Sequence, residues 1–174
     1  MDLRFVRGTI VFLTSAVLVL FISVPLILPY GQVTGLDGTP LIMDYAHIWS
    51  EMDAVSALTY GFGDILCHQE FERSVTLNGS QMPVCVRDLF IILGFLIGSV
   101  CHLIRRKEIP CRHAVVAVLA SVAIMLADHT VQLVFGLNVP STRAITGFLV
   151  GYAVSVAVEC WFQHHEWNTH AHLY

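Results

Sequence analysis

The sequence predicts an all-α membrane protein with four transmembrane helices, an extracytoplasmic amphipathic helix and a small β-hairpin cap. Hydrophobic residues make up 56% of the 174 residues, and charged residues only 13%, about half the share usual in soluble domains. The net charge of −4 excludes a nucleic-acid-binding protein, which needs a basic surplus. We expect a single integral membrane domain, 1–174, with spans at about 8–28, 85–104, 113–135 and 143–162 and an outer loop at 29–84.

The first apolar run, 8–28, follows Arg4 and Arg7 and contains no charged residue. At 1.5 Å per residue, it is long enough to cross a hydrocarbon core of about 30 Å. The run ends with Pro25 and Pro29 and lacks a small-x-small cleavage site, so we expect a retained anchor and not a cleaved signal peptide.

Two later runs are too short to cross a bilayer alone. The stretch 89–104 gives about 24 Å of helix and 114–127 gives about 21 Å. To span, the second helix must begin near Cys85 and the third must continue to about Phe135. Ionisable side chains are thereby drawn into the helix ends.

Basic residues predict the orientation of the helices. Two of them precede the first span, and four more lie between the second and third spans: Arg4, Arg7, Arg105, Arg106, Lys107 and Arg112. By the positive-inside rule both segments are cytoplasmic. We therefore expect a multi-pass protein of the cell membrane, with its N- and C-termini in the cytoplasm and the loop 29–84 outside.

Two pairs of glycines predict close contacts between helices. Gly94 and Gly98 lie on one face of the second span, and Gly147 and Gly151 lie on one face of the fourth. We expect these faces to pack helices together in the lipid bilayer, within the chain or between copies in a homo-oligomer. Chance occurrence in an apolar helix that contains glycine is the alternative.

The outer loop is predicted to carry a helix. Between Asp44 and Glu72, apolar residues recur at helical spacing, which indicates an amphipathic helix on the outer surface. Gly61 and Gly63 are expected to weaken or kink it.

An Asn-Gly pair at 78–79 stands between two short β-prone runs and predicts a hairpin with a type I′ turn. A two-residue turn would place Glu72 opposite Cys85. We therefore expect Cys67 and His68 to fold back toward Cys85.

With this topology, the outer face gathers polar side chains that are unusual in so apolar a chain. Asp128 shares a helix face with Gln132, and a carboxylate inside a span is costly unless it is paired or faces a polar cavity. Arg87 or Arg143 is the expected partner of Asp128. Either this pair only ties helices together, or Asp128, Arg73, Arg87 and Arg143 line a catalytic pocket for a lipid or an anionic small molecule.

Four further residues, Cys67, His68, Cys85 and Asp88, offer two thiolates, an imidazole and a carboxylate, all of them Zn²⁺ ligand types. The spacing of Cys85 and Asp88 is like that of a C-x-x-C pair, whose side chains reach one ion at the start of a helix. Two alternatives stay open, a Cys67–Cys85 disulfide on the oxidising outer side and two independent free thiols.

The C-terminal stretch 164–172 contains four histidines, which can collect a divalent metal. Such a tail is more often a solvated end, anchored here by aromatic residues at the membrane interface.

Motifs in both halves of the chain carry a family resemblance. They are Cys67-His68-Gln69, Arg73-Ser74, Met82-Pro83-Val84-Cys85-x-Arg87 and Gly94, followed by Asp128-x-x-x-Gln132 and Arg143-x-x-x-Gly147-x-x-x-Gly151. In this combination, over roughly 60–152, the chain resembles a family of small uncharacterised prokaryotic integral membrane proteins known only as a domain of unknown function.

In that family the second motif usually reads C-x-R-C, so Asp88 stands where a cysteine is expected. The departure replaces a four-ligand Cys/His zinc site with a mixed ligand set or a degenerate one. The family has no established activity, so the resemblance implies where a site lies and not what chemistry it performs.

Three functions follow from these observations. The first is a polytopic membrane protein with a polar, Zn²⁺-binding site at its extracytoplasmic face that acts on a lipid or an anionic small molecule. The others are a small oligomeric transporter or channel subunit, and an extracytoplasmic thiol-redox or structural accessory protein. The sequence has no Ser-His-Asp set, Walker loop or dinucleotide fingerprint, and it leaves open whether the protein is an enzyme.

Overall fold

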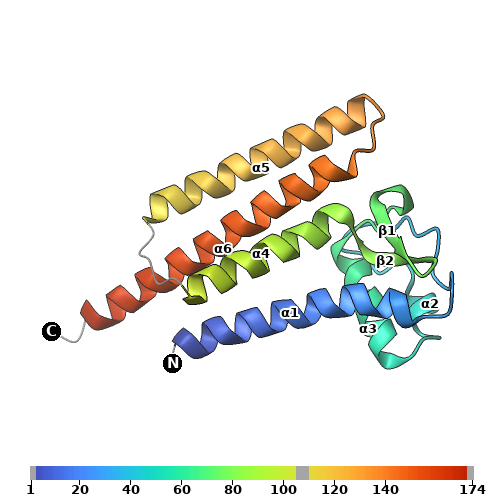
Figure 1. The fold of residues 1–174 in the computed structure, drawn as a ribbon, viewed down its shortest axis with the longest axis horizontal. Coiled ribbons are helices and arrows are strands. Elements are labelled where there is room, and N and C mark those ends of the chain that lie inside the picture. Colours follow the sequence, from blue (N-terminus) through green and yellow to red (C-terminus); the bar gives the residue numbers. More distant parts are fainter. Residues whose placement is uncertain (1–2, 105–109, 172–174) are drawn as a thin grey trace. The chain divides into compact units, whose positions relative to one another are not determined.

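The computed structural model describes the backbone of residues 3–104 and 110–171, and side chains as far as residue 164. The histidine-rich C-terminal stretch therefore lies largely outside the described residues. The chain forms two compact units, and Figure 1 shows their elements in chain order. We call Met1–Ser15 with Phe90–Tyr174 the helical unit, and Ala16–Leu89 the mixed unit.

Four helices in the described part of the chain are long and apolar enough to cross a membrane. They are α1 (Leu3–Ile27), α4 (Val86–Ile104), α5 (Cys111–Val134) and α6 (Pro140–Ala171). The predicted class, an all-α membrane protein with four candidate spans and a small hairpin, is confirmed. Because α1 begins at Leu3, Arg4 and Arg7 lie inside the helix and not before it.

In the helical unit, glycines bring α4 and α6 into backbone contact. A Cβ atom on Gly94 would collide with the carbonyl group of Phe148, and one on Gly151 would collide with that of Ile91. A Cβ on Gly98 would likewise overlap the side chain of Ser155. Both glycine faces are thus used within one chain. Whether copies of the chain also associate stays a prediction.

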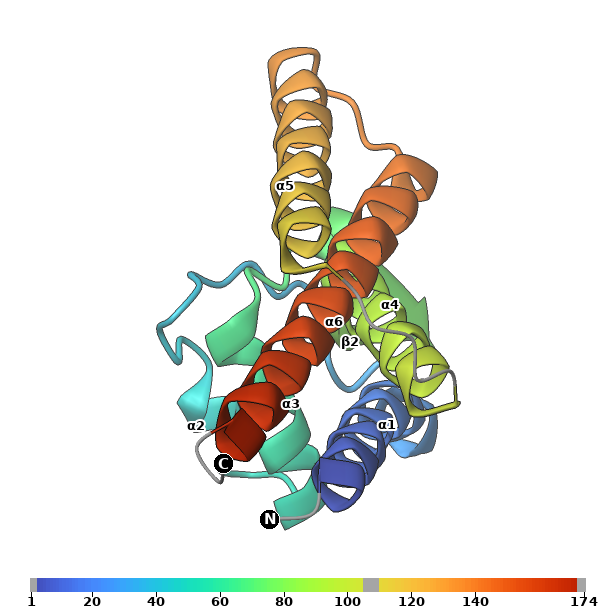
Figure 2. The same ribbon diagram turned by 90° about the vertical axis from the view of Figure 1, so that its left-hand side faces the viewer.

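Helices α5 and α6 run antiparallel, side by side, and are joined by a short turn, as Figures 1 and 2 show. Gly136 takes a positive φ of 62° in this turn, a conformation that glycine adopts at little cost. A disulfide between Cys111 and Cys160 links the same two helices, with their Cα atoms 5.5 Å apart. Sequence analysis did not predict a link between these two cysteines.

The helix predicted between Asp44 and Glu72 is divided in the structure into α2 (Ala46–Trp49) and α3 (Ala54–Leu66). The break occurs because the Asp53 side chain accepts hydrogen bonds from the first backbone amides of α3 and so begins a new helix. The two α3 glycines do not interrupt the helix, and their expected weakening effect stays a prediction. Both lie within regular helix, and Gly63 lets the carbonyl of Pro83 approach closely.

The hairpin is confirmed, with strands β1 (Ser74–Leu77) and β2 (Ser80–Cys85) following the 3-10 turn η1 (Phe71–Arg73). Asn78 and Gly79 have φ values of 50° and 72°, as a type I′ turn requires.

The predicted register is wrong, because Ser74 and not Glu72 lies opposite Cys85. An irregularity between Ser74 and Thr76 shifts the pairing. Its physical cause is Pro83, which has no N–H to donate to β1 and whose carbonyl instead accepts a hydrogen bond from Gln69 Nε2 at 2.8 Å.

The core of the mixed unit surrounds the end of α1. Its buried members include Val24, Leu28 and Leu36, together with Trp49 and Tyr60, whose rings stack with centroids 5.1 Å apart. The Tyr60 hydroxyl donates to the carbonyl of Gln81 at 2.7 Å and thereby ties α3 to β2. This contact holds the middle of α3 against the start of β2.

Candidate metal site

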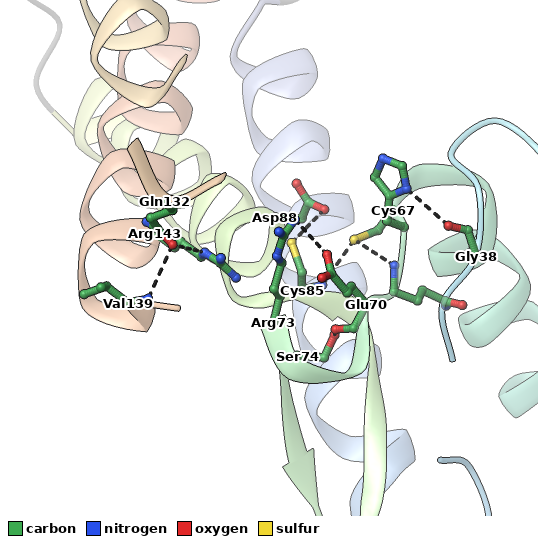
Figure 3. Close-up of polar contacts among 12 residues, drawn as sticks. Gly38, Cys67, Glu70, Arg73, Ser74, Cys85, Asp88, Gln132, Val139 and Arg143 are labelled. Carbon is green, nitrogen blue, oxygen red and sulfur yellow. Dashed lines mark hydrogen bonds and ion pairs between the residues drawn. The ribbon is translucent and has the colours of Figure 1, made fainter. Parts of the chain in front are cut away.

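Cys67, Cys85 and Asp88 come together in the mixed unit, although they belong to three different elements. Cys67 ends α3, Cys85 is the last residue of β2, and Asp88 lies in the first turn of α4. One ligand atom from each lies within 4.8 Å of the other two. Figure 3 shows the three side chains turned toward one another. Within the described residues, this is the single group of three metal-ligand side chains so close together.

Cys67 is held at the base of the site and is only 4% exposed. Its Sγ accepts hydrogen bonds from the backbone amides of Cys85, at 3.3 Å, and Gln69, at 3.5 Å. The hydrogen bond between the Cys67 and Cys85 side chains and the burial of Cys67 raise the pKa of the Cys67 thiol, and the Asp88 carboxylate raises it further.

Cys85 and Asp88 form the more accessible half of the site. The thiol of Cys85 donates to Asp88 Oδ2 with a separation of 3.2 Å, and both residues are half-buried. Asp88 is in the first turn of α4, where a carboxylate is favoured by the helix dipole. Cys67 and Cys85 are free cysteines in the structure. The Cys67–Cys85 disulfide that the sequence left open is therefore not formed in it.

His68, the fourth predicted ligand, does not join this group. Cys67 has extended backbone angles, φ −134° and ψ 148°, and neighbouring side chains on extended backbone point in opposite directions. The His68 ring is exposed, and its Nδ1 lies 3.2 Å from the carbonyl oxygen of Gly38. The structure thus brings together three of the four predicted metal ligands.

The four residues predicted to be catalytic fall in both units. Arg73 and Arg87 belong to the mixed unit, where Arg73 forms an ion pair with Glu70 at 2.7 Å and Arg87 lies one residue before Asp88. Glu70 thus neutralises one of the three arginines predicted to line a pocket for an anion.

Asp128 and Arg143 belong to the helical unit and meet through Gln132. The amide Nε2 of Gln132 lies 2.9 Å from both Asp128 carboxylate oxygens, and its Oε1 accepts from Arg143 Nε at 2.6 Å. Figure 3 shows Gln132 beside Arg143, which is only 3% exposed. The expected pairing of Asp128 with an arginine is therefore made through an amide between them.

Sequence reasoning missed one polar cluster in the helical unit. The Arg7 guanidinium makes two hydrogen bonds to the Glu159 carboxylate, and both side chains are mostly buried. They line a cavity of about 20 Å³ together with His102, whose Nε2 is buried without a hydrogen-bond partner among the described residues. A carboxylate inside an apolar span, such as that of Glu159, needs a polar partner, and this requirement could have led to a search for a basic residue.

Comparisons with known proteins place this arrangement in a family. The family model described as "Predicted membrane protein (DUF2085)" matches residues 67–157, which begin at Cys67 and include Cys85 and Asp88. The chain is also 32% identical over 106 residues to the uncharacterized protein MJ1492 of Methanocaldococcus jannaschii. That alignment covers 58% of this chain and 65% of the relative, and so less than two thirds of the relative's length.

No solved structure gives a significant match to the chain. The family model covers just over half of the 174 residues. The chain therefore belongs to the DUF2085 family of predicted membrane proteins.

Proposed function

We propose that this membrane protein binds one Zn²⁺ ion through Cys67, Cys85 and Asp88, on the extracytoplasmic side, and acts there on a lipid head group or an anionic small molecule. The observation that carries the proposal is the convergence of two sulfur atoms and a carboxylate oxygen within 4.8 Å of one another. Thiolate and carboxylate are both established Zn²⁺ ligands.

The spacing of these atoms fits a tetrahedral ion. With Zn–S near 2.3 Å and Zn–O near 2.0 Å, a sulfur and an oxygen on one tetrahedral ion are about 3.5 Å apart. Cys85 Sγ and Asp88 Oδ2 lie 3.2 Å apart. Small side-chain rotations would thus replace the thiol–carboxylate hydrogen bond by bonds from Cys85 and Asp88 to the ion, and coordination by both cysteines would release two thiol protons to solvent.

Three protein ligands leave one tetrahedral position for water or substrate, as in catalytic and not structural zinc sites. A bound Zn²⁺ ion would lower the pKa of such a water to about 7 and so supply a nucleophile for hydrolysis. Arg87, next to Asp88 in sequence, would supply positive charge for a phosphate or carboxylate group of the substrate. His68 has no role as a ligand in this proposal, since its ring hydrogen-bonds to Gly38.

Metal analysis of the purified full-length protein tests this proposal. We expect about one Zn²⁺ per chain after equilibration with Zn²⁺ and removal of unbound ion, and at least a tenfold loss of affinity in Cys85→Ala and Asp88→Ala. His68→Ala is the matched control, because it removes the adjacent metal-type side chain and should retain the ion. Wild-type protein without stoichiometric metal, or full retention by Cys85→Ala, would refute the site.

The same two sulfur atoms also support a second candidate, a thiol-redox or structural role in which Cys67 and Cys85 form a disulfide. Oxidation would remove two protons and two electrons from the pair and pass them to an oxidant of the compartment. Peptide mapping without reductant separates this candidate from zinc binding, provided that it resolves individual cysteines, because Cys111 and Cys160 are already linked. A linked Cys67–Cys85 peptide would favour the redox role and argue against thiolate coordination in that state.

A further inference from the structure

Helix α3 is amphipathic, but its polar face points inward. Ser56, Thr59 and Asp64 are at most 3% exposed, and Tyr60 is fully buried. A helix on the surface of a water-soluble protein turns its apolar stripe to the core and its polar side chains to the solvent. The polarity of α3 is the reverse of this pattern.

The exposed face of α3 is entirely apolar. No charged side chain interrupts it, since the one acidic residue of the helix, Asp64, is buried and the helix has no basic residue. The large side chains of this face are between 38% and 75% exposed, and they recur at steps that place them on one stripe: Val55, Leu58, Phe62, Ile65 and Leu66.

The apolar surface continues onto the loop before α2. Leu41, Ile42 and Met43 expose about half of their surface or more, and Leu41 N–H donates to the carbonyl of Ile65 at 2.8 Å. This loop therefore lies directly beside α3. Together the stripe and the loop form one surface, larger than the scattered apolar residues normal on a soluble protein.

The contact made by Phe62 shows which part of α1 lies beside this apolar surface. Its ring stacks against that of Phe21, with centroids 6.1 Å apart. Phe21 lies six residues before the end of α1 at Ile27, which corresponds to about 9 Å along the helix axis. Because α1 is a candidate span, Phe62 lies beside its apolar part and not beyond its end.

The segment just before α3 has the opposite character. Glu51 and Asp53 are exposed and charged, so this end of the helix needs water. Phe62 is nine residues after Asp53, about 14 Å farther along the helix. A helix that starts in water and reaches the apolar part of a span over this distance slopes into the bilayer.

Most polar groups on the inward face of α3 are hydrogen-bonded within the protein, as a hydrocarbon environment favours. Asp64 Oδ2 accepts from Trp49 Nε1 at 2.9 Å and from the Tyr45 amide at 3.0 Å. The Thr59 hydroxyl donates to the carbonyl of Val55 at 2.7 Å. Asp64 Oδ1 alone among these atoms is buried without a hydrogen-bond partner in the described part of the chain.

We propose that α3 is a re-entrant helix that dips into the bilayer leaflet at the C-terminal end of α1, with its stripe against lipid acyl chains. The occupant is lipid and not a soluble protein, because Phe62 of the stripe stacks on Phe21 of the candidate span α1, whose side chains Leu20 and Ile22 are themselves exposed and apolar.

Fluorescence quenching by brominated lipid tests the proposal. Full-length Leu58→Trp and Glu51→Trp variants are placed in phosphatidylcholine bilayers with and without bromine on the acyl chains, and the emission of the wild type, which has three tryptophans, is subtracted. Leu58 is the most exposed residue of the stripe, and Glu51 is the matched control outside it. We expect bromine to lower the added emission at position 58 about twofold, with little change at position 51.

A second measurement keeps the proposal falsifiable if Leu58→Trp does not fold. Phe62→Trp retains an aromatic ring at the contact with Phe21 and should also be quenched. Absence of quenching at the folded stripe positions would overturn lipid contact. If particle mass in the same bilayers also indicated two copies, a second chain and not lipid would be the occupant.

Discussion

Arg7 and Glu159 form a two-point ion pair between α1 and α6, with Nη2 2.8 Å from Oε1 and Nε 3.0 Å from Oε2. Gln163 also donates to Glu159 Oε1 at 3.0 Å. Planar guanidinium and carboxylate groups that meet in this way define both distance and angle between the two helices. The pair therefore fixes α1 against α6 within the helical unit.

Removing one partner of this pair should destabilise the protein. Glu159→Ala leaves the mostly buried Arg7 guanidinium without its carboxylate, and we expect a loss of about 3 kcal/mol in the free energy of unfolding. The double variant Arg7→Met with Glu159→Met should recover most of that loss, because it removes both charges. Unfolding in detergent by circular dichroism measures both changes, and equal losses in the single and double variants would contradict the ion-pair explanation.

A second prediction concerns the stability that the glycine contacts between α4 and α6 provide. Gly151→Val places a branched side chain where the carbonyl of Ile91 lies, so we expect a loss of about 1–3 kcal/mol through overpacking. Gly8→Ala is the control, because a Cβ atom at Gly8 meets nothing within 4 Å. It should be neutral or slightly stabilising. Equal thermal stability of Gly151→Val and wild type would show that the helices do not pack through this glycine.

Hydrophobic runs and local turn chemistry made much of this fold predictable. Four apolar runs predicted the four long helices, and the Asn-Gly pair at 78–79 predicted the hairpin turn, because both signals depend on neighbouring residues. The strand register was not predictable in the same way. It depends on the hydrogen bond from Gln69 to the carbonyl of Pro83, which only the folded chain brings together.

The candidate site was predicted only in part, because some of its contacts also form only in the folded chain. The motif spacing placed Cys67 near Cys85 and Asp88, but local backbone conformation turned the neighbouring His68 away. The pairing of Arg7 with Glu159 joins residues 152 positions apart. Spacing along one helix or strand cannot reveal a contact of that kind.

The disulfide between Cys111 and Cys160 can be checked by peptide mapping without reductant. We expect one linked peptide that contains both residues and disappears on reduction. Because the bond closes a loop of 49 residues, Cys111→Ser should lower the free energy of unfolding by up to about 4 kcal/mol. Cys101→Ser is the control, since Cys101 is a free cysteine. Unlinked Cys111 in protein purified without reductant would contradict the prediction.

Gln132 should stabilise the end of the helical unit where the chain turns from α5 into α6. Its amide donates to Asp128 and Thr142, and its carbonyl accepts from the buried Arg143, so Gln132→Leu removes the bridge while keeping a similar volume. Hydrogen bonds to charged groups contribute about 1.5–3 kcal/mol each, and we expect a total loss of at least about 2 kcal/mol because both charged residues stay in place.

Thr130→Val provides the comparison for this substitution. Thr130 lies on the same helix, but its exposed hydroxyl bonds only to the carbonyl of Leu126 one turn earlier, so its replacement should change stability by less than about 0.5 kcal/mol. Thermal unfolding of both variants in the same detergent measures the difference. If Gln132→Leu unfolded at the temperature of Thr130→Val, Asp128 and Arg143 would have to be stabilised independently of Gln132, and the bridging role of its amide would be wrong.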